Sequence, residues 1–531
     1  MLIFWSDNNR STPYKVYVLI LLFVLTSSLS YSQEKKKVEI LYSGYGESVE
    51  GMEVNSQRLV DSVHISHNEI LMWCDTAYMY TGTNKVDARG NVHIKQGDTL
   101  HLYARNVFYD GDIEFARAWG NVHLINKSTH IYSDTLDYDL ASNISYYDDF
   151  GKIVDSTTTL TSIIGKYFID DDNIFFYQDV VGYNDDFTLN SDTVLYNTET
   201  GRIFVNGPTT IQDTVNTLYT EDGWYDSNTG EAELLKNPFV FGETQQLGAN
   251  YIKYNEDNGK GRALGAVRIE DFDNKSIVLG NTVEYDEIQE TAMVTDSAVY
   301  MAYSDADTLY LHADTLLTVP DTIEEEKIIS AYYGVRFFRN DLQGLCDSMV
   351  YYTRDSVVQL YQNPIIWSEN HQLSANFIEM KQYANAPDEL RLTEKSFIIS
   401  EQDSGRFDQI KGKEMIGYIV NQELDKISVN GNGQTLYYAK EEETIIGLNR
   451  AESSRIAIQF LEGKIYKIAF LKQPQGELKP LKELKEEDKA LKDFDWKIDQ
   501  RPVSRHDIFP KQEEQIFEEA EETKKNTLPR N

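Results

Sequence analysis

Apolar residues alternate along many short stretches of the chain, and the alternation changes phase once within each stretch. In one such stretch the apolar positions are Leu102, Ala104, Val107 and Tyr109, separated by steps of two, three and two residues. A straight strand would keep a step of two, because successive side chains point to opposite faces. The step of three therefore predicts a bulge or sharp bend that restores the inward direction. We expect each strand to fold over, with one arm on each side of a shared interior.

The same spacing recurs along the chain, and a second kind of strand alternates strictly around a glycine. Copies of the first kind are Ile131-Ser133-Leu136-Tyr138, Leu189-Ser191-Val194-Tyr196, Leu247-Ala249-Ile252-Tyr254 and Leu373-Ala375-Ile378-Met380. Copies of the second are Ala88-Gly90-Val92-Ile94, Ala118-Gly120-Val122-Leu124 and Ala263-Gly265-Val267-Ile269. The glycine position recurs as Gly207, Asn237-Pro238 and Asn363-Pro364, which predicts a tight corner there.

Turn signals separate the two kinds of strand. Asn197 to Gly201, Asp226 to Gly230 and Asn255 to Gly259 each follow a tyrosine, begin with Asn or Asp, and end with Gly. Such short connections join antiparallel strands. The period is about 29–30 residues over residues 60–471, which predicts about 13–14 antiparallel two-strand repeats. The expected fold is all-β: an elongated, open β-jellyroll solenoid.

The two ends of the chain differ from the repeats. Arg10 and Lys15 precede the apolar run Val16 to Leu25, so residues 1–32 are typical of a signal peptide, with an uncleaved membrane anchor as the alternative. Residues 33–59 are expected to form a lead-in strand or linker, and a break between two subdomains could fall near residues 320–327. Residues 472–531 are charged and predict a tail that is partly helical, over Leu481 to Trp496, and otherwise disordered.

Charge and cysteine content narrow the classes of partner. The net charge of −36 excludes nucleic acid as a partner and does not favour binding to an anionic membrane surface. The only cysteines, Cys74 and Cys346, occupy nearly the same repeat position about nine repeats apart. In a stacked array they are too far apart for a disulfide, so we expect two buried free thiols.

Candidate catalytic and metal-binding residues all have a simpler structural interpretation. His93 and His123 share a repeat position and could form a metal ladder, but they alternate with inward apolar residues and should point outward, and zinc spacing is absent. Asp-Thr pairs recur in one register, which favours side-chain-to-backbone bonding over the paired carboxylates of a glycosidase or lyase. These aspartates are Asp75, Asp134, Asp192 and Asp314. No catalytic residue, metal site or cofactor is expected, and the chain is interpreted as non-enzymatic.

The complete repeat unit is clearest at Leu102 to Leu124 and at Leu247 to Ile269. It resembles the OstA-like family, which includes the periplasmic lipopolysaccharide-bridge proteins and the N-terminal domain of the outer-membrane translocon. The resemblance extends over about 400 residues. It implies an open β-jellyroll shaped like a taco shell, whose apolar groove holds the acyl chains of lipid A. It also implies partners of the same fold, joined end to end by strand addition. The array is about twice the length expected of a bridge subunit, and the translocon barrel is missing.

The expected function is therefore carriage of lipopolysaccharide through the periplasm toward the outer membrane, without a cofactor. An association with the outer membrane is left open. A structural or adhesin-like surface solenoid with a closed interior is the alternative, and a parallel β-helix polysaccharide lyase is a third. The candidate groove residues are Val92, Ile94, Leu102, Ala104, Val107, Val122, Leu124, Leu189, Val194, Leu247, Ile252, Val267 and Ile269.

Overall fold

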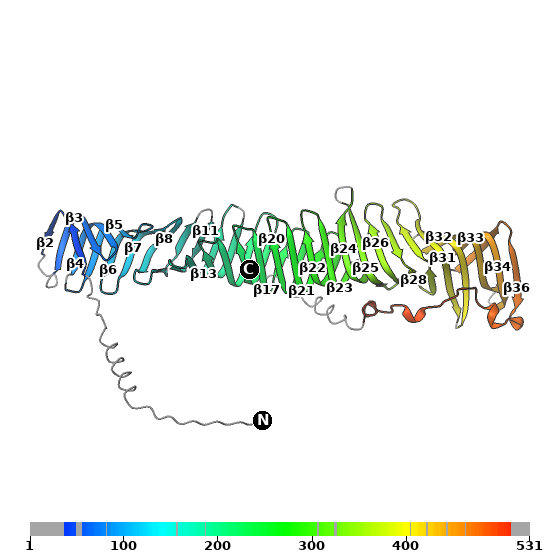
Figure 1. Cartoon of the computed structure of the whole chain (residues 1–531). Coiled ribbons are helices and arrows are strands. Elements are labelled where there is room, and N and C mark those ends of the chain that lie inside the picture. The colour runs from blue at the N-terminus through cyan, green and yellow to red at the C-terminus, as the bar shows by residue number, and fades with distance from the viewer. Residues whose placement is uncertain are drawn as a thin grey trace, which may run out of the picture. The chain divides into compact units, whose positions relative to one another are not determined.

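A computed structural model describes residues 37–510 apart from a few short gaps (Figure 1). The gaps are residues 49–55, 81, 156–157, 186, 305–306, 323–325, 404, 421–422, 442–443 and 462–463. The expected signal peptide, residues 1–32, lies outside the described residues, as do residues 511–531. The chain forms two compact units, Met1–Gly151 and Lys152–Asn531. Residues 320–327 lie within the second unit.

The first unit consists of β-strands joined by short turns. They are β1 (Glu39–Tyr42), β2 (Tyr45–Glu47), β3 (Ser56–His67), β4 (Ile70–Tyr80), β5 (Lys85–Gln96), β6 (Leu100–Asp110), β7 (Phe115–Asn126), β8 (Thr129–Asp139) and β9 (Ile144–Tyr147). From β3 to β9 each strand pairs with the next in antiparallel register, and β1 and β2 both pair with β3.

The second unit continues the same pattern, after β10 (Gly151–Asp155). Its strands up to the middle of the unit are β11 (Thr158–Ser162), β12 (Ile164–Phe168), β13 (Asn173–Tyr183), β14 (Thr188–Asn197), β15 (Arg202–Gln212), β16 (Thr217–Asp226), β17 (Glu231–Lys236), β18 (Phe239–Phe241), β19 (Gln245–Gly248), β20 (Tyr251–Asn255), β21 (Lys260–Asp271), β22 (Ser276–Asp286), β23 (Thr291–Tyr303) and β24 (Thr308–Pro320).

The later strands are β25 (Lys327–Arg339), β26 (Leu342–Tyr352), β27 (Val357–Tyr361), β28 (Ile365–Ser368), β29 (His371–Ser374), β30 (Phe377–Lys381), β31 (Asp388–Asp403), β32 (Arg406–Val420), β33 (Glu423–Glu441), β34 (Thr444–Leu461), β35 (Lys464–Leu471) and β36 (Gln475–Pro480). Among these later strands, β31 to β34 are the longest, with 15–19 residues each. No described helix is long and apolar enough to cross a membrane.

The mid-strand bend predicted from the step of three is present. Where β6 pairs with β7, the register shifts between Tyr103 and Asn106. This is where the step of three separates the inward residues Ala104 and Val107. Both of these residues are buried, although their positions have opposite parity along the strand. The expected corners are also confirmed. Gly90, Gly120, Gly207 and Gly265 have positive φ, where a side chain would be strained, and Asn237-Pro238 and Asn363-Pro364 interrupt strands.

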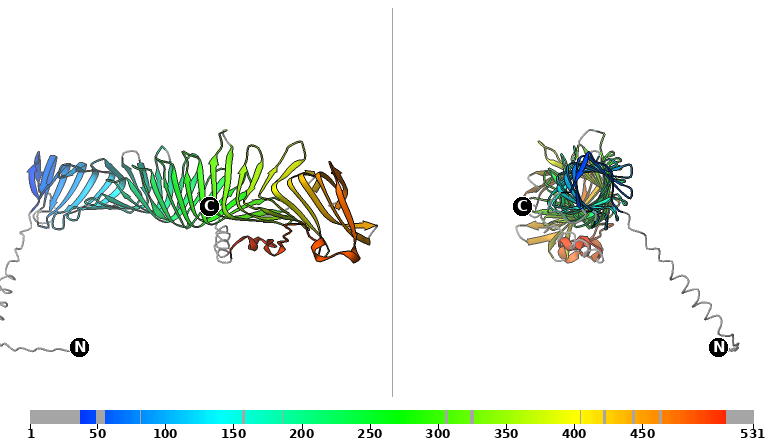
Figure 2. Two further views of the ribbon diagram at one scale, coloured as in Figure 1. Left: turned by 45° about the vertical axis from the view of Figure 1, so that its right-hand side comes forward. Right: turned by 90° about the vertical axis from the view of Figure 1, so that its left-hand side faces the viewer.

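Bending brings the two ends of one strand close together. Kept straight, β6 would hold its ends roughly 33 Å apart. In the structure, however, Tyr109 at the end of β6 contacts His67 at the end of β3. The pairing of β3 with β4, β4 with β5 and β5 with β6 aligns His67 with Leu100, at the start of β6. The end-on view shows the strands of the first unit curling so that their arms face each other (Figure 2). We call the side where the strand ends meet the mouth.

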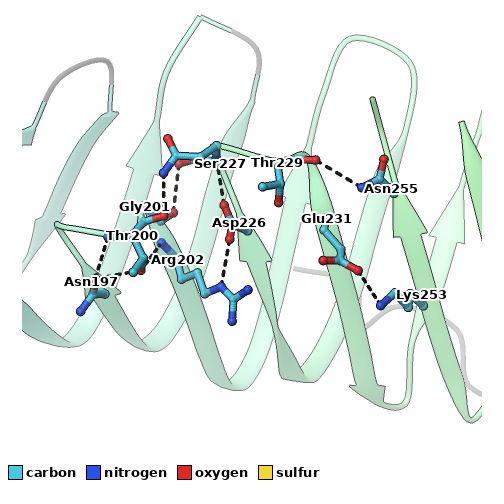
Figure 3. Close-up of polar contacts among 11 residues, drawn as sticks. Asn197, Thr200, Gly201, Arg202, Asp226, Ser227, Thr229, Glu231, Lys253 and Asn255 are labelled. Atoms are coloured by element: carbon cyan, nitrogen blue, oxygen red, sulfur yellow. Dashed lines mark hydrogen bonds and ion pairs between the residues drawn. The ribbon is translucent and has the colours of Figure 1, made fainter. Parts of the chain in front are cut away.

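Side chains of the turns connect successive repeats along one row (Figure 3). The side-chain oxygen of Asn197 accepts a hydrogen bond from the Thr200 backbone N–H, as expected for a turn that Asn begins. In the next turn, Ser227 Oγ donates to the Gly201 carbonyl at 3.0 Å, and further along the Asn255 amide donates to the Thr229 carbonyl at 3.3 Å. These contacts join each turn to its neighbour, so the spacing of repeats is fixed on this side.

The structure corrects the expectation for the segment after Lys472. Residues 475–480 form a strand, β36, which pairs with β34. Four short 3₁₀ helices then follow in place of the expected helix over Leu481 to Trp496. They are η1 (Leu481–Glu483), η2 (Glu486–Asp488), η3 (Ile498–Gln500) and η4 (Arg505–Ile508). Residues 481–510, which we call the strap, run along the outer face of the later strands (Figure 1).

Packing explains why the strap is ordered. Leu491 of the strap contacts an outer-face cluster that includes Phe397 and Ile399, whereas Ile398 between them belongs to the inner core. Further along, Ile508 and Phe509 pack in the same way on an outer-face cluster. That cluster contains Ile277, Leu279, Val299 and Met301. Burial on the sheet holds a segment whose charged sequence forms no helix.

The two thiols are free and buried, as predicted. Burial raises the pKa of both Cys74 and Cys346 to about 12, because the thiolate would be desolvated. We therefore expect neither thiol to react with Ellman's reagent at neutral pH in the folded protein, and both to react in denaturant. Reaction of either thiol within minutes without denaturant would contradict this burial.

Candidate functional site

The interior of the first unit is closed to solvent. Seven of the groove candidates lie here, and all are buried. They are Val92, Ile94, Leu102, Ala104, Val107, Val122 and Leu124. Ile94, Leu102 and Leu124, which are register-aligned on β5, β6 and β7 just beneath the mouth, are each 0% exposed. The predicted inward direction of these side chains is confirmed, and whether they contact a ligand stays a prediction.

Buried tyrosines close the mouth of the first unit. Tyr109, 1% exposed, has its phenol oxygen 2.6 Å from Nδ1 of His67 on the opposite row of turns. Tyr138, 0% exposed, donates to Oε1 of Gln96 at 2.6 Å, and the amide nitrogen of Gln96 donates to Oδ1 of Asn143 at 3.1 Å. Burial is the main cause that raises the pKa of Tyr109, so its phenol stays protonated.

The same bond appears in the first repeats of the second unit. Tyr196, 4% exposed, donates from its phenol to Oδ2 of Asp155 at 2.9 Å. Burial and the nearby Asp155 carboxylate raise the pKa of Tyr196. We call the set of contacts made by Tyr109, Tyr138 and Tyr196 the tyrosine seam. The sequence pattern did not reveal the seam, because each partner lies about forty residues away along the chain.

The seam changes farther along the second unit. Tyr254 occupies the same repeat position as Tyr196, but its phenol donates to Glu287 Oε2 at 2.6 Å, and Glu287 lies in a turn on the same row. Tyr285, the next tyrosine in this position, is 43% exposed. The Tyr254 phenol therefore bonds along its own row and the Tyr285 side chain is largely exposed, in contrast to Tyr109 and Tyr138.

Apolar side chains beneath the mouth become partly exposed in this same section. We call six register-aligned residues on β16, β18, β19, β21, β22 and β23 the rim row. They are Leu218, Val240, Leu247, Ile269, Val278 and Tyr300. All six pack against the inner core but are only partly buried. Ile269 and Ile94 are both isoleucines at the same repeat position, yet only Ile94 is fully buried.

The remaining groove candidates lie in the second unit, on both sides of this change. Leu189 and Val194 on β14 are buried beside the seam, and Ile252 and Val267 are buried deeper in the core. Leu247 and Ile269 belong to the rim row. The structure therefore places all the candidates on the inner face, and it separates those beneath a closed mouth from those at partly exposed positions.

The inner walls of the second unit offer mainly apolar contact. The core of the second unit consists of Leu, Ile, Val, Ala, Met, Phe and Cys side chains. The backbone groups of its strands are engaged in antiparallel ladders on either side, for example β21 with β20 and β22. A peptide strand placed inside would leave its own backbone polar groups unpaired, at a cost of several kcal/mol, roughly 1–3 kcal/mol for each group. A hydrocarbon chain has no such requirement.

The two histidines singled out from the sequence lie on the outer face of the first unit, as predicted. His93 Nε2 is 3.0 Å from His101 Nδ1, and His123 Nε2 is 3.0 Å from His130 Nδ1. Their rings stack with neighbouring aromatic residues, His93 on Trp73 and Tyr103, and His123 on Tyr132. Among the described residues, no group of three or more His, Cys, Asp or Glu side chains could hold a metal ion.

These histidine pairs predict a loss of stability in mild acid. Burial, followed by the nearby His101 and Lys95, lowers the pKa of His93, and burial and His130 lower that of His123. Both imidazoles are neutral above about pH 6.5. Below this pH the histidines take up protons more readily in the unfolded chain than in the folded one, so the free energy of unfolding falls as the pH falls. We expect the midpoint temperature of thermal unfolding of the first unit to fall between about pH 7.5 and about pH 5.5 in the wild type. In the variant His93→Phe/His123→Phe this fall should be smaller. An equal acid shift in both proteins would contradict this assignment.

The recurring Asp-Thr pairs lie at the bends. Asp75, Asp134, Asp192 and Asp314 are all exposed beside the mid-strand register shifts. Asp75 accepts a hydrogen bond from the side-chain amide of Asn91 at 2.9 Å, across the bend of the neighbouring strand. This contact is structural, but it joins two side chains and not a side chain to the backbone as predicted. The aspartates lie outside the interior and face solvent.

Comparison with known proteins adds a family assignment for the first part of the chain. Residues 35–192 match the family described as OstA-like protein. No curated protein matches the sequence. Among solved structures, a match is found to LptH, described as the LptA-homologous periplasmic component of the lipopolysaccharide transport device of Pseudomonas aeruginosa. The match is 14% identical, covers 26% of this chain and 81% of LptH, and has a TM-score of 0.14. Residues 35–192 are therefore similar to the OstA-like family, as the repeats in this part of the chain indicate.

Proposed function

We propose that the protein is a non-enzymatic carrier of lipopolysaccharide in the periplasm, which holds the acyl chains of lipid A in its apolar interior and passes the lipid toward the outer membrane. The observation that carries the proposal is the rim row, whose six side chains on the inner face of the second unit are only partly buried. The OstA-like segment supports it, because membership of that family implies lipopolysaccharide transport.

The energetics suit a ligand held by its hydrocarbon part alone. Burying each methylene contributes about 0.8 kcal/mol, so several acyl chains are retained without any ionic contact. The net charge of −36 fits this arrangement, because the phosphates and sugars of the lipid would then stay in solvent outside the mouth. A protein that gripped the phosphates directly would need a basic surface.

Strand edges at the two ends of the chain are the proposed docking surfaces for proteins of the same fold. In the first unit, β1 and β2 pair only with β3 among the described strands, and Leu41, Tyr42 and Tyr45 are more than half exposed. In the second unit, β35 and β36 pair only with β34 in the described part, and Tyr466 is 71% exposed. Unpaired edges with exposed apolar side chains favour strand addition.

Site-specific photocrosslinking tests the proposal. A chain lacking residues 1–32 would carry an aliphatic diazirine residue at Ile252, which lies on the inner face, or at Lys253, which lies on the outer face. With increasing lipopolysaccharide we expect a saturable adduct from position 252 and little from position 253. Equal or absent labelling at the two positions would overturn the carrier function.

A structural solenoid remains the second candidate, because the closed interior that it requires is present in the first unit. That function leaves surface lipopolysaccharide unchanged when the protein is depleted from cells, whereas the carrier function predicts a loss. The lyase alternative is contradicted, since every described strand pair is antiparallel, for example β5 with β6 and β21 with β22.

A further inference from the structure

We propose that the lipid's hydrocarbon chains enter sideways through the mouth of the second unit, over the rim row, and that the tyrosine seam keeps the preceding repeats closed to them. This inference rests on the proposed carrier function and assigns its binding site to one section of the chain. It distinguishes the groove candidates of the rim row, Leu247 and Ile269, from those beneath the seam.

Regular spacing indicates that the seam is built into the repeat. The tyrosine and its partner are separated by 42 residues for Tyr109 and His67, 42 for Tyr138 and Gln96, and 41 for Tyr196 and Asp155. In each case the partner is the last residue of a strand in the opposite row. Each of these three bonds joins the two rows, and parting the rows would leave a buried phenol and its polar partner unpaired at each of them.

The partner needed to continue the seam is engaged elsewhere in the later section. Forty-one residues before Tyr254 stands Asp213, by the same spacing that joins Tyr196 to Asp155. The carboxylate of Asp213 instead accepts hydrogen bonds from the backbone N–H groups of Val215 and Asn216, at 2.6 and 2.5 Å, within its own turn. Tyr254 bonds to Glu287 along its own row. Both groups that would close the mouth here thus have other partners.

The rim row forms a continuous apolar strip under this part of the mouth. Its six strands, each about 4.8 Å from the next, give a strip roughly 24 Å long. The matching strip of the first unit contains Met72, Ile94, Leu102, Leu124 and Ile131, in the same kind of register, and all five are buried. Residue type is similar in the two strips, so the difference in exposure follows from the mouth above them.

The occupant that fits this strip is a hydrocarbon chain. Val278 and Ile269 present methyl groups from adjacent strands, and the backbone groups between them are already paired with each other. A peptide or a sugar would have to give up hydrogen bonds to water without replacement, whereas an acyl chain gives up none. Lipid A is the source to which we assign the chain, since the proposed function supplies it.

The test compares two inner positions in otherwise wild-type protein. An aliphatic diazirine residue would be placed at Leu102, beneath the seam, or at Val278, in the rim row, and purified lipopolysaccharide added. We expect at least tenfold more adduct from position 278. Comparable labelling at both positions would overturn the inference while leaving the carrier function standing. Absence of labelling at both would overturn the carrier function itself.

Seam variants supply the second arm. In the double variant Tyr109→Phe/Tyr138→Phe, with the probe at Leu102, we expect labelling to rise at least tenfold, because the phenols no longer bond to His67 and Gln96. Tyr254→Phe, which removes only a bond along one row, is the matched control and should leave labelling at position 278 unchanged. An unchanged yield at Leu102 in the folded double variant would contradict the seam's role. If the double variant does not fold, the comparison of labelling at positions 102 and 278 in the otherwise wild-type protein still tests the inference.

Discussion

Replacing Leu491 with alanine is expected to lower the free energy of unfolding of the second unit by about 2–5 kcal/mol, the range for a large buried aliphatic side chain. Leu491 is almost completely buried between the strap and the outer face of the sheet. It packs there in a cluster with Phe397, Ile399, Leu436 and Leu448. Truncation would leave a cavity in this contact, which is the strap's main apolar anchor at this end.

Urea-induced unfolding measures this effect. Lys482→Ala, at an exposed position of the same segment, is the control and should change the free energy of unfolding by less than about 0.5 kcal/mol. If Leu491→Ala unfolds at the same urea concentration as this control, the strap is not part of the packed structure.

Two buried glutamines should contribute to the same strap contact. Gln409 accepts a hydrogen bond from the Leu491 backbone N–H and donates to the Lys489 carbonyl, both at 2.8 Å. Gln372 makes the same pair of contacts on either side of Trp496. We expect Gln409→Ala to lower the free energy of unfolding by about 1–3 kcal/mol. In the double variant with Leu491→Ala the loss should be smaller than the sum of the two single losses, because both changes release the same segment.

The second large effect concerns the rim row. Val278→Asp is expected to weaken lipopolysaccharide binding at least about 100-fold, which corresponds to about 2.7 kcal/mol, because an acyl chain would have to lie against an ionised carboxylate. Val278 is partly exposed at the mouth, so the carboxylate can remain hydrated in the free protein and the fold should tolerate it.

Val278→Ala is the matched control for this charge. It removes methyl contact but keeps the strip apolar, so we expect a loss of roughly tenfold or less. Equilibrium binding of fluorescently labelled lipopolysaccharide measures both variants. Wild-type affinity in the aspartate variant would place the acyl chains elsewhere.

Local pattern was enough to predict the strand, its bend and its inward face. The step of three between Ala104 and Val107 predicted the observed register shift, and Gly90 and Pro238 marked corners. These features depend on neighbouring residues, whose steric and hydrogen-bonding preferences are local. For the same reason the inward side chains could be identified one by one from the sequence.

The state of the mouth could not be predicted in this way. Ile94 and Ile269 are identical in type and repeat position, and their burial differs because of tyrosines that contact partners about forty residues away in sequence. Whether Tyr138 reaches Gln96 or turns along its own row, as Tyr254 does, depends on how three successive strands converge.

The strap was missed because its apolar residues follow no regular period. A signal for it was nevertheless present in the strands that it covers. The run Phe397, Ile398, Ile399 is apolar on both faces of β31, and so is Ile277, Val278, Leu279 on β22. A strand with two apolar faces needs a cover on each side. Such runs late in an otherwise alternating array indicate an outer-face partner.

Cysteine accessibility at the mouth tests the central claim, that the apolar interior of the second unit is open to a lipid chain. In a chain with Cys74→Ala and Cys346→Ala, the single substitution Val278→Cys should react rapidly with a maleimide, and saturating lipopolysaccharide should protect it. Leu102→Cys in the same background should react slowly with or without lipid. Slow reaction at position 278, or rapid reaction that lipid does not change, would contradict the account.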